Sequence, residues 1–221
     1  MCGRMTLKTT GESLAEAFDL DEIPDLLPRY NIAPTQLVAA IRRDDAGRRR
    51  LARLRWGLVP FWAKDLKIGN QLINARSETI AEKPAFRSAF KKRRCIVPVD
   101  GFYEWKKLPK TKQPYLIGRR DKRPFAIAGL WESWTSPEGE VVETCTLLTT
   151  ESNELIRELH NRMPVILVPR DIDVWLDPAR SPEDLKQLLS PAPAAEMAMV
   201  AVSQRVNSPR VDDADLWDPE S

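Results

Sequence analysis

The second residue of the chain is a cysteine, within the opening sequence Met1-Cys2-Gly3-Arg4. Removal of the initiator methionine would leave the α-amine and the thiol of Cys2 on adjacent carbon atoms, which makes the residue a 1,2-aminothiol. An aldehyde reacts with such a group in two stages, because the amine forms an imine and the thiol then closes a thiazolidine ring. A cysteine near a chain end is ordinarily a chance residue at a frayed terminus. The chemical interpretation of Cys2 therefore depends on the other motifs.

Four other segments combine side chains that suit proton transfer, hydrogen bonding or stacking. They are Asn74-Ala75-Arg76-Ser77-Glu78, Asp100-Gly101-Phe102-Tyr103-Glu104-Trp105, His160-Asn161-Arg162-Met163-Pro164 and the tryptophan-bounded loop 56–62. Glu104 lies in a strand-like run, where an outward carboxylate is usual but an inward, desolvated one would suit proton transfer. Asn74 and Arg76 could simply close a turn, and His160 at a helix end is more often a cap than a catalyst. Trp62, in a proline-bent loop, could offer a stacking face instead of packing in the core.

The cysteine and histidine content argues against a metal centre. The chain has three cysteines, Cys2, Cys95 and Cys145, without a Cys-x-x-Cys pair, and a single histidine, His160. This content favours neither a disulfide framework nor a zinc site. We therefore expect no metal and no cofactor.

Length and composition favour one soluble domain. The 221 residues are 43% hydrophobic and 30% charged, which is sufficient for a sizeable core. We interpret residues 1–221 as a single, monomeric domain with a loosely held acidic tail from about residue 212. No basic-then-apolar signal opens the chain, and no apolar run approaches membrane-spanning length. We therefore expect a cytoplasmic or nucleoid-associated protein without a membrane partner.

The net charge of +2 is too small to identify a nucleic-acid-binding protein by itself. The basic residues are nevertheless bunched, most densely in Arg48-Arg49-Arg50 and Lys91-Lys92-Arg93-Arg94. Such bunching is compatible with a local basic groove but not with a uniformly basic surface. The second run also ends a predicted helix, where it could simply be a solvated C-terminal end.

Hydrophobic periodicity and turn residues predict an interleaving of short strands and short helices. We expect helices over residues 10–19, 84–93, 152–160, 171–176 and 182–189. We expect strands over residues 37–42 and 50–57, paired as a hairpin, and over 95–99, 101–105, 115–118, 125–134, 141–149, 165–168 and 197–202. Pro28 and Pro34 predict a structured loop between them. Because strict βαβ alternation is absent, the pattern favours an α+β fold with a curved, mainly antiparallel sheet.

Taken in order, these segments resemble the SOS-response-associated peptidase (SRAP) family, whose members are understood as abasic-site processing proteins. The resemblance spans nearly the whole chain and rests on Met1-Cys2-Gly3-Arg4, Tyr30-Asn31-Ile32-Ala33-Pro34, Trp56-Gly57-Leu58-Val59-Pro60-Phe61-Trp62, Asn74-Ala75-Arg76-Ser77-Glu78, Arg94-Cys95-Ile96-Val97-Pro98-Val99-Asp100-Gly101-Phe102-Tyr103-Glu104-Trp105, Gly129-Leu130-Trp131 and His160-Asn161-Arg162-Met163-Pro164. None of the positions that the family uses for chemistry is missing. The resemblance implies an α+β fold with a barrel-like sheet, flanking short helices and a positively charged DNA groove.

The reaction that this resemblance implies is covalent capture of an abasic site in single-stranded DNA, through a thiazolidine at Cys2. It also implies that His160 assists opening of the sugar ring and that Glu104 accepts a proton from the α-amine. Asn74 is implied to hold the chain terminus or the sugar by amide hydrogen bonds. A strand-cleaving lyase activity and an (auto)peptidase activity are compatible with the same residues.

The binding residues implied by the resemblance are three arginines and one tryptophan. Arg4, Arg76 and Arg162 lie inside the motifs nearest the chemistry and are the phosphate-binding candidates. Trp62 is the candidate for a wedge against neighbouring bases. Since an abasic site has no base, we expect contacts with the backbone to dominate over sequence readout.

Three other functions are compatible with parts of the chain. A Met-Cys-Gly start also opens glutamine amidotransferases in which the N-terminal cysteine is the nucleophile, but that match stops after three residues. A thiol peptidase could pair Cys2 with His160. A non-catalytic module for binding single-stranded DNA would form a salt-sensitive complex without a stable adduct.

Overall fold

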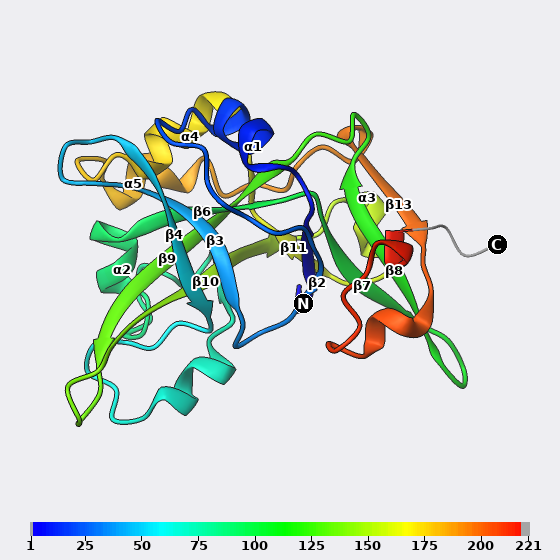
Figure 1. Ribbon diagram of the computed structural model, residues 1–221, viewed down its shortest axis with the longest axis horizontal. Coiled ribbons are helices and arrows are strands. Elements are labelled where there is room, and N and C mark those ends of the chain that lie inside the picture. The colour runs from blue at the N-terminus through cyan, green and yellow to red at the C-terminus, as the bar shows by residue number, and fades with distance from the viewer. Residues whose placement is uncertain (1, 218–221) are drawn as a thin grey trace.

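The computed structural model describes residues 2–217, which form two β-sheets with short flanking helices (Figure 1). The strands are β1 Met5–Leu7, β2 Arg29–Ile32, β3 Leu37–Arg43, β4 Arg49–Trp56, β5 Asn74–Arg76, β6 Arg94–Val99, β7 Gly101–Lys107, β8 Lys112–Arg119, β9 Phe125–Thr135, β10 Val141–Glu151, β11 Arg162–Pro164, β12 Ile166–Leu167 and β13 Met197–Ala201. The α-helices are α1 Gly11–Phe18, α2 Arg87–Lys92, α3 Glu154–Arg157, α4 Pro169–Leu176 and α5 Pro182–Lys186. Short 3-10 helices are η1 Leu66–Gln71, η2 Ala194–Glu196, η3 Gln204–Asn207 and η4 Ala214–Trp217. Within residues 2–217, every helix is too short or too polar to cross a bilayer.

One sheet closes on itself as a barrel. Its strands follow the order β10-β4-β3-β6-β9, and β9 pairs back with β10. The pairings around this ring are antiparallel except for the parallel pairing of β10 with β4. The C-terminal end of β10 extends past the ring and pairs with β5 and with β11. The barrel thereby brings together two of the motifs singled out in the sequence.

Apolar side chains from every strand of the barrel are buried in one continuous core. Examples from the five strands are Ile41, Leu54, Ile96, Leu130 and Leu147, each of which is fully buried. Burial of apolar surface is the dominant favourable contribution to folding, so this core is what keeps the barrel closed.

The second sheet lies beside the barrel and has the order β13-β8-β7-β1-β2. The chain passes from the barrel to this sheet at Asp100, between β6 and β7. The buried Asp100 carboxylate accepts hydrogen bonds from the backbone N–H groups of Lys8 and Thr9 and from the Thr9 hydroxyl. The next position, residue 101, requires glycine, because a Cβ atom there would lie 2.9 Å from the carbonyl oxygen of Ile117. This junction fastens the end of β1 to both sheets.

The structure confirms the α+β class, the barrel-like sheet and most of the predicted elements. The hairpin of β3 and β4 and the long strands β9 and β10 lie where the sequence predicts them. The helix predicted over 10–19 is α1, which begins after Thr10 and buries Leu14 and Phe18. The Thr10 side chain accepts a hydrogen bond from the Ser13 N–H, as a capping residue does.

Several predicted boundaries are wrong. The segment 28–34, predicted as a loop, contains β2, because β1 offers it an edge to pair with. The helix predicted over 152–160 is limited to α3, and the helix over 84–93 to α2. The strands β1, β5 and β11 are three residues each and were not predicted. Segments that short show no hydrophobic period, so long-range pairing alone defines them.

The acidic segment from residue 212 is packed as far as residue 217. Asp212 accepts hydrogen bonds from the backbone N–H groups of Tyr30 and Asn31, and Leu216 is fully buried. The expectation of a loosely held tail is therefore wrong for residues 212–217. Residues 218–221 lie outside the described part of the chain.

Arg94, at the start of β6, is a buried cation with a structural role. Its guanidinium donates hydrogen bonds to the carbonyl oxygens of Phe90, Lys91, Trp175 and Asp177. These carbonyls lie at the C-terminal ends of α2 and α4, where a helix leaves its last carbonyls without partners. Arg94 is 4% exposed, so the solvated end predicted for this basic run is wrong at Arg94. The side chain instead joins two helices to the barrel.

We expect Arg94→Ala to lower the free energy of unfolding by roughly 3–5 kcal/mol, because several buried carbonyls lose their donors together. Equilibrium urea unfolding followed by circular dichroism measures the change. Arg120→Ala is the matched control, since Arg120 donates to the Ala195 carbonyl at the surface. That control should cost about 1 kcal/mol or less. An equal loss for both variants would contradict the role assigned to Arg94.

Candidate active site

Cys2 lies at the junction of the two sheets, separated from the start of β1 by Gly3 and Arg4. The residue is 1% exposed, and its Sγ atom lies 4.0 Å from the carbonyl oxygen of Arg4. The Cys2 carbonyl oxygen accepts a hydrogen bond of 2.8 Å from the side-chain amide of Asn74. Asn74 belongs to β5, on the barrel side, whereas β1 belongs to the second sheet. The two sheets are therefore hydrogen-bonded to each other at Cys2.

The pairing of β7 with β1 brings Glu104 alongside Cys2. The Tyr103 N–H donates to the Arg4 carbonyl at 2.9 Å. Because the two strands are antiparallel, the residues that precede Arg4 lie alongside those that follow Tyr103. Glu104 is 4% exposed, so its carboxylate takes the inward orientation and not the usual outward one.

The surroundings of the Cys2 thiol disfavour the thiolate. Burial raises the pKa of this thiol far above its ordinary value, and the negative charge of Glu104 raises the pKa further. The thiol is therefore protonated at neutral pH. Sites that activate a cysteine do the opposite, since a nearby cation or a helix N-terminus lowers the thiol pKa.

His160 follows α3 and is oriented by β11. Its Nδ1 atom accepts a hydrogen bond of 2.9 Å from the Arg162 N–H, which leaves Nε2 to carry the proton of the neutral ring. Lys106 shares a face of β7 with Glu104, because side chains two residues apart on a strand point the same way. Lys106 pairs with Glu158 at 3.7 Å, at the end of α3. This ion pair places the end of α3, which leads to His160, towards the Glu104 face of β7.

Arg162 and Arg76 lie on β11 and β5, which flank the end of β10. The Arg162 guanidinium contacts both oxygens of the Glu78 carboxylate, one of them at 2.9 Å, and donates to the Thr149 carbonyl at 2.6 Å. This contact lowers the pKa of Glu78, with a smaller contribution from the charge of Arg76. Arg76 itself is exposed. Of the two predicted phosphate-binding residues on these strands, one is therefore open to solvent and the other is paired.

Arg4 is held within the second sheet. Its Nη1 atom donates to the Asn31 side-chain oxygen at 2.6 Å and also to the Val206 carbonyl. The guanidinium carbon lies 5.9 Å from the centre of the Trp105 ring. Burial lowers the pKa of Arg4 from its ordinary value. Part of this predicted phosphate-binding group is thus already committed to contacts inside the protein.

The residues that hold Arg4 in place were not predicted as site residues. Asn31 is fully buried and contacts Arg4 directly, and Asp212 binds the backbone next to Asn31. The sequence offered one signal for Asn31, because it lies inside the motif 30–34. It offered none for Asp212, which lies in the predicted tail.

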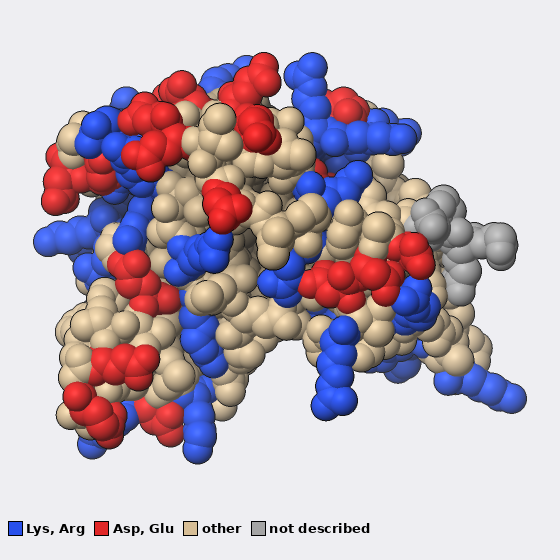
Figure 2. Space-filling view, viewed as in Figure 1, with Lys and Arg blue, Asp and Glu red and all other residues tan. Residues whose placement is uncertain are grey.

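Trp62 lies in the loop between β4 and η1. It is 50% exposed, and the adjacent Phe61 is 60% exposed. Figure 2 shows a hollow at the lower edge of the molecule, between the two lobes, with positively charged side chains on both sides. The β4–η1 region, cyan in Figure 1, forms the lower part of the barrel lobe beside this hollow. The loop between β4 and η1 thus belongs to the lobe that borders the hollow.

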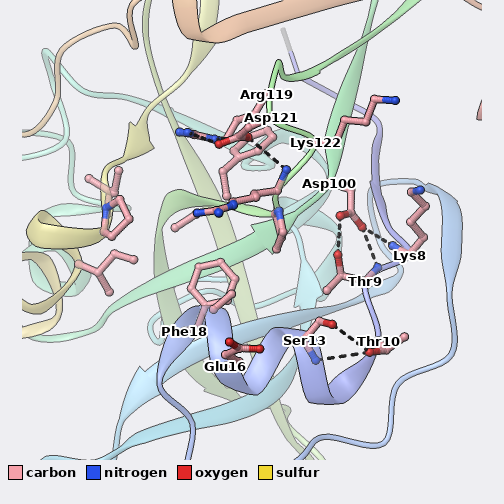
Figure 3. A pocket seen from close by; sticks show the side chains of 18 of the residues that line it. Lys8, Thr9, Thr10, Ser13, Glu16, Phe18, Asp100, Arg119, Asp121 and Lys122 are labelled. Carbon is pink, nitrogen blue, oxygen red and sulfur yellow. Dashed lines mark hydrogen bonds and ion pairs between the residues drawn. The ribbon is translucent and has the colours of Figure 1, made fainter.

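A pocket of about 810 Å³ lies elsewhere, between α1, the β8–β9 turn and the start of α4 (Figure 3). Neither Cys2 nor Glu104 lines it. Two charged groups of its lining are paired with each other, since Arg119 contacts Asp121 at 2.8 Å. Within residues 2–217, the Cys, His, Asp and Glu side chains form no group of three that could hold a metal ion. The chemistry of the side chains therefore points to Cys2 as the site.

Comparison with known proteins finds one family that covers nearly the whole chain. The family described as SOS response associated peptidase (SRAP) matches residues 1–209. The chain is 47% identical over 226 residues to abasic site processing protein YoaM of Bacillus subtilis, which covers 100% of this chain and 99% of YoaM. It is 34% identical over 195 residues to abasic site processing protein HMCES of Xenopus tropicalis, which covers 74% of this chain and 58% of HMCES.

Solved structures share the two-sheet architecture. The crystal structure of a protein from Bacteroides thetaiotaomicron matches with a TM-score of 0.90 at 27% identity, covering 100% of both chains. A crystal structure from Bordetella bronchiseptica matches with a TM-score of 0.80 at 29% identity, covering 92% of this chain and 100% of that one.

The buried thiol leads to a prediction about pH. In the folded protein, alkylation of Cys2 by iodoacetamide should keep accelerating above about pH 9, because the thiol remains protonated there, whereas an ordinary thiol has a pKa of about 8.5. In urea-unfolded protein the rate should level off above that ordinary value. Peptide mass spectrometry after timed quenching separates Cys2 from Cys95 and Cys145. If the alkylation rate of folded Cys2 levels off at the same pH as in the unfolded chain, the pKa of the thiol is not raised by the fold and the prediction is wrong.

Proposed function

The chain belongs to the SOS response associated peptidase (SRAP) family, and on that premise we propose that it captures abasic sites in single-stranded DNA covalently through Cys2. The observation that carries the proposal is the placement of Asn74 and Glu104 beside Cys2. The names of YoaM and HMCES, both abasic site processing proteins, agree with it. Capture requires removal of Met1, so that Cys2 has a free α-amine.

The proposed reaction consumes one aldehyde and releases one water molecule. The deoxyribose of an abasic site presents an aldehyde carbon, C1′, once its ring opens. The Cys2 amine adds to this carbon, and loss of water from the adduct leaves an imine. The thiol sulfur then adds to the imine carbon while its proton passes to the nitrogen, which closes the thiazolidine. Every atom is accounted for without an oxidant, a reductant or a metal.

The protonated thiol supports an order in which the amine reacts first. A thiol held protonated by burial and by the Glu104 charge is a weak nucleophile towards the aldehyde. The α-amine has an ordinary pKa of about 8 and therefore needs a proton acceptor to react at neutral pH. In the proposal, the buried Glu104 carboxylate accepts that proton.

His160 acts on the sugar in this proposal. With Nδ1 held by the Arg162 N–H, the other ring nitrogen is the one able to exchange a proton with the sugar during ring opening. The same group could promote strand cleavage by β-elimination, which is the lyase activity compatible with the family. Asn74 fixes the Cys2 carbonyl, while its own Oδ1 is buried and has no hydrogen-bond partner within residues 2–217. This oxygen is suited to accept a hydrogen bond from the amine or from a sugar hydroxyl.

We place the DNA strand in the hollow between the lobes. Arg76 is exposed and available to a phosphate, whereas a phosphate that binds Arg162 must displace Glu78. Arg4 would use the part of its guanidinium that Asn31 leaves unoccupied. Exposed Trp62 supplies a surface on which a neighbouring base can stack. The proposal needs one chain, no cofactor and access to chromosomal DNA, so it places the protein in the cytoplasm.

The same observations favour a thiol peptidase less. Such an enzyme needs a thiol with a lowered pKa, activated by an imidazole that is itself oriented for proton transfer. Here burial raises the pKa of the Cys2 thiol instead.

Protein that begins at Cys2, verified by intact mass, should form a one-to-one covalent species with single-stranded DNA that carries one abasic site. Undamaged DNA of the same sequence is the control and should form none. Cys2→Ser should give an adduct after borohydride reduction but no stable adduct without it, because its amine forms an imine that the hydroxyl closes poorly. If a denaturing gel shows no covalent species for the wild type, the non-catalytic DNA-binding module becomes the better assignment.

Glu104→Gln keeps the shape of the side chain and removes the proton acceptor. Single-turnover crosslinking should slow by about 100- to 10,000-fold at neutral pH, which is the usual contribution of a general base. Raising the pH from about 6 to 9 should restore part of the rate, because the amine then loses its proton to solvent. Glu138→Gln is the matched control, since Glu138 is exposed in the turn between β9 and β10. A wild-type rate for Glu104→Gln across this range would remove Glu104 from the proposed site.

A further inference from the structure

Residues 204–217, which we name the C-terminal clasp, pack against β1 and β2. The family match ends at residue 209, so the second half of the clasp lies beyond it. Val206 and Leu216 anchor the clasp as fully buried side chains. The Trp217 ring N–H donates to the Thr6 hydroxyl at 3.1 Å, and the Lys8 ammonium lies 4.2 Å from the centre of that ring. The clasp thus contacts the strand that directly follows Cys2.

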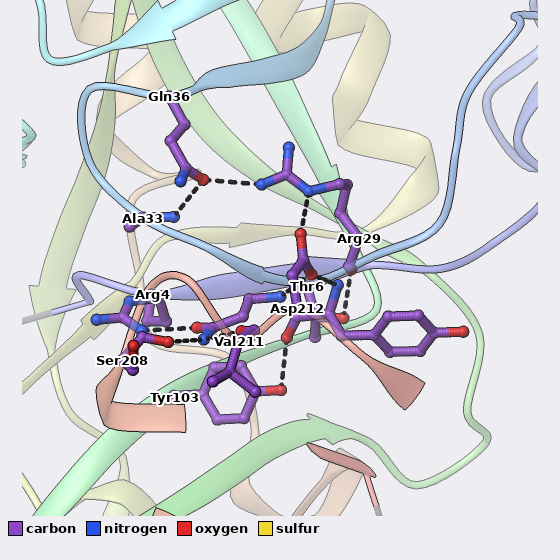
Figure 4. Close-up of polar contacts among 11 residues, drawn as sticks. Arg4, Thr6, Arg29, Ala33, Gln36, Tyr103, Ser208, Val211 and Asp212 are labelled. Carbon is purple, nitrogen blue, oxygen red and sulfur yellow. Dashed lines mark hydrogen bonds and ion pairs between the residues drawn. The ribbon is translucent and has the colours of Figure 1, made fainter. Parts of the chain in front are cut away.

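Asp212 forms the hydrogen bonds that join the clasp to β2 (Figure 4). Its Oδ1 atom accepts hydrogen bonds from two consecutive backbone N–H groups, those of Tyr30 at 2.5 Å and Asn31 at 2.8 Å. Its Oδ2 atom accepts a hydrogen bond from the Arg29 guanidinium. Because one oxygen accepts from two consecutive N–H groups, the backbone of β2 is fixed at this point.

Asn31 transmits this constraint to Arg4. The Asn31 side chain is fully buried, and its Nδ2 atom lies within hydrogen-bond distance of the carbonyl oxygens of Val206, Ser208 and Val211. Its Oδ1 atom accepts the 2.6 Å hydrogen bond from Arg4. Both ends of the amide are therefore in use, and the amide cannot rotate without breaking these bonds.

These contacts form a continuous path from the clasp to the reactive residue. Arg4 lies two residues after Cys2, so a fixed Arg4 sets the direction of the chain as it reaches the aminothiol. We infer that Asp212 is a positioning residue for Cys2: it holds β2, β2 holds Arg4 through Asn31, and Arg4 holds the segment between Cys2 and β1 in place beside β7. The inference rests on the proposed function only for its effect on the rate of crosslinking.

The inference requires an acceptor oxygen at residue 212 in the position that binds the two backbone N–H groups. It does not require a negative charge there. Asp212→Asn removes the charge but keeps an oxygen that can accept from the two backbone N–H groups. Asp212→Glu keeps the charge and the ion pair with Arg29 but moves the carboxylate by one methylene group. A positioning role therefore ranks Asp212→Asn above Asp212→Glu, whereas a role in charge pairing alone ranks them in the opposite order.

The experiment is single-turnover crosslinking to saturating abasic-site DNA, well below the unfolding midpoint of each variant. Asp212→Ala should react about 10- to 100-fold more slowly than the wild type, the usual effect of displacing a reacting group by a fraction of an ångström to one ångström. Asp212→Asn should stay near the wild-type rate, and Asp212→Glu should fall between Asn and Ala. Asp213→Ala is the matched control, because Asp213 pairs with Arg205 on the exposed side of the clasp at 2.6 Å.

A second measurement needs no DNA. Alkylation of the buried Cys2 thiol should be about fivefold faster or more in Asp212→Ala than in Asp213→Ala, a factor that corresponds to the loss of about one hydrogen bond from the restraint. Hydrogen exchange at the Tyr30 and Asn31 amides should accelerate in the same variant. If Asp212→Ala does not fold, the order of Asp212→Asn and Asp212→Glu in both assays decides the matter.

Three results would overturn the inference. One is a wild-type crosslinking rate in folded Asp212→Ala, even if its unfolding midpoint is lower, because that result describes a purely stabilising residue. Another is a faster rate for Asp212→Glu than for Asp212→Asn, and the third is unchanged alkylation of Cys2 in Asp212→Ala. If the wild-type protein forms no crosslink, the proposed function fails, while alkylation and hydrogen exchange still test the positioning role.

Discussion

The arrangement of the site depends on β1, the first strand of the chain, which lies between two other strands of its sheet. β1 follows Cys2 after two residues and pairs with β2 on one side and with β7 on the other. A chain end is ordinarily the loosest part of a domain, because it is fastened on one side only. Here the two strand pairings and the Asn74 hydrogen bond to the Cys2 carbonyl remove that freedom. Cys2 therefore has a defined position in the fold. In the proposed reaction, such a position would lower the entropic part of the barrier.

This placement takes several polar groups out of water, and their partners come from distant parts of the chain. Arg4 is paired by Asn31, and Asn31 is in turn held by the backbone of the C-terminal clasp. Asp100 is satisfied by the backbone N–H groups of Lys8 and Thr9, which follow the C-terminal end of β1. Buried polar groups are costly unless they are hydrogen-bonded, so these networks stabilise the arrangement and also specify it. The Cys2 thiol is buried in its neutral form, which is the form that burial favours.

The arginines of the motifs have the same charge but different roles. The burial and the partners of each guanidinium decide which role it has. Arg94 is buried and binds carbonyls at two helix ends, so it supports the barrel. Arg162 is paired with Glu78 across the gap between β11 and the segment after β5, whereas Arg76 on β5 is exposed. A guanidinium that already has several partners organises the protein, and an exposed one is available to a phosphate. A run of basic letters in a sequence does not distinguish these cases.

The sequence by itself determined the parts that depend on local rules. Thr10 marks the start of α1, the turn before Arg49 marks the hairpin of β3 and β4, and the spacing of motifs around Cys2, Asn74, Glu104 and His160 indicated the family and its candidate site residues. Only the tertiary structure decided how the barrel closes through β9, β10 and β4, that Glu104 turns inward, and that Asp212 binds Asn31 across 181 residues. Strand closure, register and such distant contacts leave no local period or turn signal, because the two partners are brought together by the folded chain and not by their own neighbours.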